Sequence, residues 1–134
     1  MIPVLVSIPL YLLATGLLVA GLRRDHAPGR AWLPVAAAAM LMHALEHVLA
    51  WRAIGGADMH FYAALSLVTL GMAVLTSAVG AYGRLATLGV VVFPLAAAML
   101  LGNHLHGHLP PQPLDWRLQL HAWLALLAYA TLAV

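Results

Sequence analysis

Charged side chains are so scarce in this sequence that most of the chain cannot face water. The 134 residues include six arginines, no lysine and four acidic residues, and 64% of all residues are apolar. A water-soluble domain carries about 25% charged residues, because its surface must be hydrated. This chain must instead expose its surface to lipid, and its apolar stretches are long enough to cross a bilayer as helices. We therefore predict an all-α, polytopic transmembrane helix bundle.

Long apolar stretches separated by short polar turns set the number of spans. A helix crosses the hydrocarbon core in about 20 residues, so the chain has room for four full spans and a fifth. We expect these spans to form a single transmembrane domain over residues 1–134. We place them at Ile2–Leu22, Ala31–Trp51, Phe61–Tyr82, Leu85–Leu105 and Leu118–Val134. Small residues inside the third and fourth spans, such as Gly71, Gly80 and Ala96, predict close helix packing.

Arginine placement predicts how the spans are oriented. If the N-terminus lies outside, four arginines fall in inner loops and two in outer loops: Arg23, Arg24, Arg30 and Arg84 against Arg52 and Arg117. The positive-inside rule therefore favours an outside N-terminus. Six arginines are also too sparse for a nucleic-acid surface, so the lipid bilayer is the expected partner and nucleic acid is not.

Ionisable residues occur in the middle of the second predicted span. Glu46 and His47 stand three and four residues after His43, so the three side chains share one helical face. Such groups at membrane depth usually face a bundle interior or a wet cavity. One interpretation makes His43 an axial ligand for haem or a metal, with Glu46 and His47 beside it. The other makes the three residues a polar cluster that joins helices by hydrogen bonds.

Three alternating histidines end the fourth predicted span. His104, His106 and His108 supply imidazoles of the kind that gather around zinc, copper or nickel. On a helix, however, His104 and His108 share a face and His106 points away. A metal site, with His47 as a further candidate ligand, and a solvated polar helix end are both consistent with this spacing.

No motif of a known enzyme chemistry occurs in the sequence. It contains no Walker loop, no GxSxG and no HExxH, so we do not expect an enzyme. The absence of cysteine excludes disulfides, thiolate ligands and the C-x-x-C-H motif that attaches haem covalently.

The last predicted span resembles a family signature. LQLHAWLALLAYATL, over Leu118–Leu132, opens with His121 and reaches a Tyr-Ala step at Tyr129 and Ala130. It is similar to the cytochrome c assembly membrane proteins of the CcsA/CcmC type, and most of all to their shorter YpjD-like inner-membrane members. The run of spans agrees along the whole chain. The family's tryptophan-rich WWD segment is absent, so we expect the chain to be the N-terminal half of a longer protein.

The resemblance implies haem handling. In the family, one histidine within the membrane and histidines at the outer face serve as haem ligands, and by position these are His43 and His121. It implies a protein that binds or translocates haem for c-type cytochrome maturation, together with other membrane proteins of that process. Two alternatives stay open beside it: a divalent-metal-binding membrane protein using the histidine triplet, and a packing subunit without a ligand.

Overall fold

The computed structural model describes residues 1–23, 29–82, 86–107 and 116–133, and in these ranges all regular structure is helical. The helices are α1 (Ile2–Leu22), α2 (Trp32–Ile54), α3 (Phe61–Gly80), a short 3-10 helix η1 (Ala86–Leu88), α4 (Gly89–His106) and α5 (Trp116–Leu132). The predicted all-α fold is confirmed.

Four helical segments are long and apolar enough to cross a membrane. They are α1, α2, α3 and the continuous stretch Ala86–His106. The apolar part of α5, Leu120–Leu132, is shorter than the other four. The outward faces of the long helices carry exposed leucines and valines, such as Leu12, Leu41 and Val91, as a lipid-facing surface requires. The chain is a multi-pass membrane protein.

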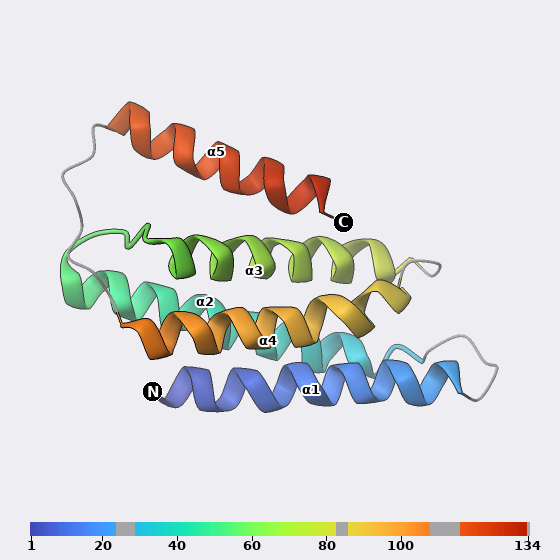
Figure 1. Ribbon diagram of the computed structural model, residues 1–134. Coiled ribbons are helices and arrows are strands. Elements are labelled where there is room, and N and C mark those ends of the chain that lie inside the picture. The colour runs from blue at the N-terminus through green and yellow to red at the C-terminus, as the bar shows by residue number, and fades with distance from the viewer. Residues whose placement is uncertain (24–28, 83–85, 108–115, 134) are drawn as a thin grey trace.

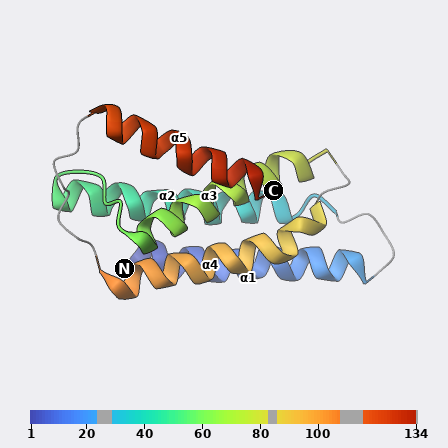
Figure 2. The same ribbon diagram turned by 45° about the horizontal axis from the view of Figure 1, so that its top comes forward.

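The four long helices lie side by side with alternating direction, and α5 lies along α3 (Figure 1). Helix α1 packs against α2 and α4, and α3 packs against α4, α2 and α5. The turned view also places α5 on the side of the bundle away from α1 (Figure 2). We call the end where α1 and α3 begin and α2 and α4 end the histidine-rich end; it lies at the left in Figure 1.

Two glycines end helices at the histidine-rich end. Gly55, which follows α2, has a φ of 81°, and Gly107, which follows α4, has a φ of 71°. A residue without Cβ adopts this left-handed region at little cost and lets the last helical carbonyls find partners. Gly55 thus ends α2 after Ile54, which is three residues beyond the predicted end at Trp51.

Three aromatic rings and many alanines fill the centre of the bundle. Tyr11 stacks on Phe93 with ring centroids 5.9 Å apart, and Phe93 contacts Trp32 at 6.0 Å. Around them, small residues let the helices approach closely. A Cβ added at Gly80 would lie 3.0 Å from the backbone of Ala86. The predicted close packing is confirmed at this residue and at the fully buried Ala96.

Candidate functional site

The second-span residues singled out in the sequence face the interior of the bundle. His43, Glu46 and His47 are all buried on α2 near the histidine-rich end. Their spacing places them on one face of the helix, as predicted, and this face meets residues of α1, α3 and α4. The structure therefore brings together polar groups from four helices in the half of the bundle nearer the histidine-rich end.

Both ring nitrogens of His43 have hydrogen-bonding partners. Nδ1 lies 3.2 Å from the Tyr11 hydroxyl and Nε2 lies 2.8 Å from the Ser66 hydroxyl. The His43 side chain is 0% exposed. An iron atom could bind this imidazole only after one of the two hydrogen bonds had been given up. The geometry favours the interpretation in which His43 joins helices.

The Ser66 hydroxyl connects two imidazoles. Its oxygen lies 2.8 Å from His43 Nε2 and 3.0 Å from His47 Nε2, and the two rings stack with centroids 5.5 Å apart. Tyr11, His43, Ser66 and His47 thus form a continuous hydrogen-bonded chain through α1, α2 and α3. Within a membrane, each such contact spares a polar group from meeting hydrocarbon.

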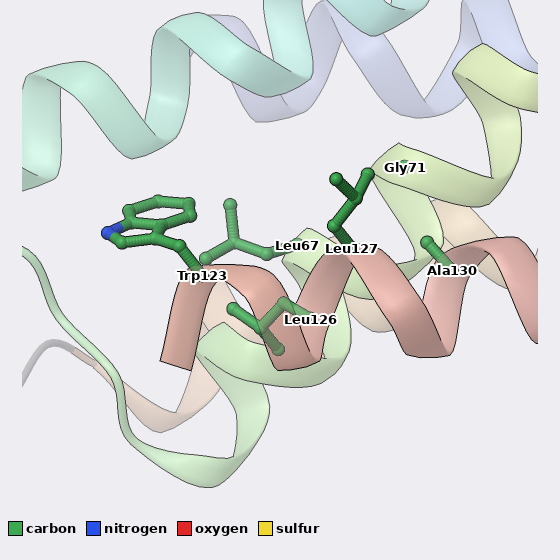
Figure 3. A pocket seen from close by; sticks show the side chains of 6 residues that line it. All are labelled: Leu67, Gly71, Trp123, Leu126, Leu127 and Ala130. Atoms are coloured by element: carbon green, nitrogen blue, oxygen red, sulfur yellow. The ribbon is translucent and has the colours of Figure 1, made fainter. Parts of the chain in front are cut away.

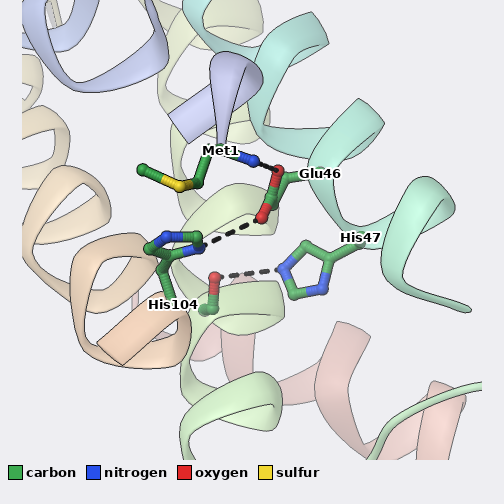
Figure 4. Close-up of polar contacts among 5 residues, drawn as sticks. Met1, Glu46, His47 and His104 are labelled. Carbon is green, nitrogen blue, oxygen red and sulfur yellow. Dashed lines mark hydrogen bonds and ion pairs between the residues drawn. The ribbon is translucent and has the colours of Figure 1, made fainter. Parts of the chain in front are cut away.

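Glu46 forms a second polar contact at the same end. Its Oε1 lies 3.3 Å from His104 Nδ1 on α4, and its Oε2 lies 3.9 Å from the Met1 amino group (Figure 4). Figure 4 also shows His47 pointing away from Glu46, toward the hydroxyl of its partner Ser66. The carboxylate is thus held between the start of α1 and the end of α4.

The members of the predicted histidine triplet that the structure describes have separate partners. His104 contacts Glu46, whereas His106 Nδ1 donates to the Gly102 carbonyl oxygen at 2.8 Å. The His106 ring stacks on Tyr62 with centroids 3.6 Å apart. His108 lies outside the described residues. Among the residues that the structure does describe, no three histidine or acidic side chains are arranged to hold a metal ion, so the triplet site stays a prediction.

His121 lies on an exposed face of α5, and α5 packs along α3, away from α1. No hydrogen bond joins the His121 imidazole to another part of the described chain. The two haem ligands predicted from the family resemblance are therefore not brought together: His43 is enclosed in the bundle and His121 is presented on its surface.

The opposite face of α5 meets α3 around a small apolar groove. The groove encloses about 150 Å³ and is lined by Leu67, Gly71, Trp123, Leu126, Leu127 and Ala130 (Figure 3). At its narrow end a Cβ added at Gly71 would lie 2.9 Å from the Ala130 Cβ. The alanine of the Tyr-Ala step is thus a packing residue, and Tyr129 is exposed.

Sequence reasoning missed four buried polar residues. Tyr11 and Ser66 hold the imidazoles of α2, and Asp58 binds His60 Nδ1 at 2.6 Å in the turn before α3. Asn103 is fully buried on α4. A hydroxyl inside an apolar span is a weak signal, because serine and threonine also bond to their own helix backbone.

Comparison of the chain with protein-family models, curated proteins and solved structures finds no match.

Proposed function

We propose that this membrane protein binds haem, or passes it on, for c-type cytochrome maturation, and that His121 is the residue that meets the haem iron. The observation that carries the proposal is the exposed imidazole of His121 on a helix that is otherwise largely apolar. No hydrogen bond within the described chain holds this imidazole, so it can meet a ligand.

The face of α5 around His121 has the chemistry that a haem would need. Arg117, Leu124 and Ala128 stand four residues before and three and seven residues after His121, so they lie on the same side of the helix. All three are exposed. Haem combines an iron atom that accepts imidazole, an apolar ring and two propionates. On this face His121 would bind the iron, Leu124 and Ala128 would contact the ring, and Arg117 would pair with a propionate.

The resemblance in Leu118–Leu132 is what suggests haem as the ligand, because His121 is the histidine that opens its signature. By contrast, the bonds from His43 to Tyr11 and Ser66 support a structural role for the second-span histidine. We therefore assign the first contact with haem to α5. Other membrane proteins of cytochrome c maturation would supply or receive the haem.

Haem titration of the purified protein tests this function. We expect a Soret band that weakens strongly in His121→Ala and partly in Arg117→Gln. His106→Ala is the matched control, since it removes another exposed imidazole and should leave the band unchanged. A protein that ignores added haem would refute the proposal. The band could instead be lost in His43→Ala and unchanged in His121→Ala. If circular dichroism showed a normal helix content in His43→Ala, the residue that binds the haem iron would be His43 inside the bundle.

We further propose that the protein lies in a bacterial plasma membrane with its N-terminus and histidine-rich end outside. Because the chain has no cysteine, single cysteines report orientation directly. Arg52→Cys, at the histidine-rich end, should react with an impermeant maleimide added to intact cells. Arg23→Cys, at the opposite end, should react only after the membrane is permeabilised, and the reverse pattern would invert the topology.

A further inference from the structure

A fully buried asparagine on α4 has unmet hydrogen-bonding capacity. Asn103 is 0% exposed, and neither its amide nitrogen nor its amide oxygen hydrogen-bonds to any residue that the structure describes. Its side chain offers two donors and an oxygen with two lone pairs. Burying such a group without partners is costly in any protein and more so where hydrocarbon surrounds the bundle. Asn103 therefore points to a bound polar molecule.

The neighbours of Asn103 show where this molecule would lie. Asn103 follows Leu100 by three residues and Ala96 by seven, and both are fully buried, so it belongs to the interior face of α4. On one side of it, a Cβ added at Gly102 would lie 3.6 Å from the Tyr62 ring of α3. On the other side, His104 contacts Glu46 of α2. The amide thus lies among the helices at the level of the Glu46–His104 pair.

We propose that Asn103, Glu46 and His104 enclose a water-binding site inside the membrane domain, at the histidine-rich end. Water suits these partners, because it can accept from the amide N–H groups and donate to the amide and carboxylate oxygens. The Glu46 carboxylate can accept a further hydrogen bond. His104 lies near its Oε1, and the Met1 amino group, 3.9 Å from its Oε2, is beyond hydrogen-bonding distance. A buried internal water typically needs two to four polar partners, and this site supplies three side chains.

The site would let water reach the Glu46 carboxylate and the His104 imidazole within the membrane-spanning part of the chain. Ionisable residues in spans commonly face water-filled cavities for this reason. A separate hydrogen-bonded chain of Tyr11, His43, Ser66 and His47 ends at the residue that follows Glu46 on α2. The inference goes beyond haem handling by His121 and does not depend on it.

The test uses the fact that Asn103 is the only asparagine in the chain. Protein labelled with ¹⁵N-asparagine has a single side-chain amide group, which gives one pair of proton signals at one nitrogen frequency in an NMR spectrum. We expect a cross-peak between this amide and water with the sign of a bound water molecule, and fast exchange of the amide protons in D2O. A missing water cross-peak together with slow exchange would show a dry side chain and overturn the proposal.

Two variants sharpen the result. Glu46→Leu removes a wall of the site and should abolish the water cross-peak, whereas Leu49→Ala, a change on the exposed face of the same helix, should leave it intact. Asn103→Leu gives a readout that does not need NMR. If the amide were dry, leucine would remove an unsatisfied polar group and raise the melting temperature. An unchanged or lower melting temperature is expected for the hydrated site.

Discussion

Removing the Ser66 hydroxyl should destabilise the bundle more than its size suggests. Ser66→Ala deletes one oxygen atom, yet that oxygen lies 2.8 Å from His43 Nε2 and 3.0 Å from His47 Nε2. Both imidazoles are buried, so neither nitrogen can turn to bulk water. The substitution therefore removes the hydroxyl that both imidazoles share and, with it, two hydrogen bonds between α3 and α2.

The size of the effect follows from hydrogen bonds measured in membrane proteins. Such bonds contribute on average about 0.6 kcal/mol, and at most about 1.7 kcal/mol. Two of them give an expected loss of about 1 to 3 kcal/mol in the free energy of unfolding. The measurement is unfolding of the purified protein in mild detergent by added sodium dodecyl sulfate, followed by helix content.

Ser77→Ala is the matched control for this prediction. Ser77 lies on the same helix and is also buried, but its side chain reaches only the Met40 sulfur at 3.9 Å. Sulfur is a weak acceptor, so the free energy of unfolding should change little. If Ser66→Ala cost no more than Ser77→Ala, the hydroxyl would not hold the two imidazoles, and the structural role assigned to His43 would be refuted.

Two glycine substitutions test the helix packing. Gly71→Ala would place a Cβ 2.9 Å from the Ala130 Cβ, so we expect α5 to be displaced and its segment to be cleaved faster by protease. The same change at Gly16, where a Cβ would meet nothing within 4 Å, should have no such effect. Gly89→Ala would bring a Cβ to 2.8 Å from the Phe93 ring, and overpacking of this kind costs about 1 to 3 kcal/mol. A lower melting temperature is expected, and an unchanged one would contradict the packing described here.

The pattern along the chain was sufficient to predict the helices. Apolar stretches and sparse charges predicted the five α-helices because lipid permits few other structures, and Ile2–Leu22 was predicted to the residue. The 3-10 helix η1 was predicted as part of the fourth span. The boundary of α2 was missed by three residues, because a left-handed glycine at position 55 ends it and hydropathy does not register backbone conformation. The loop between α4 and α5 lies outside the described residues.

The candidate site was predictable only in part. Spacing placed His43, Glu46 and His47 on one helical face, and the structure confirms that this face is buried. Their partners could not be predicted, because Tyr11, Ser66 and His104 are separated from them by 19 to 58 residues in the sequence. Which helices become neighbours depends on side-chain packing across the bundle, and that information is not local.

The sequence by itself determined that this chain spans a membrane as a set of helices, because its charge content leaves no other surface. It also determined that the polar groups of α2 face inward, since helical spacing fixes which side chains share a face. Only the tertiary structure decided what they meet there. It enclosed His43 between two hydroxyl groups and left His121 exposed on α5, because α5 packs along α3 and not within the four-helix interior.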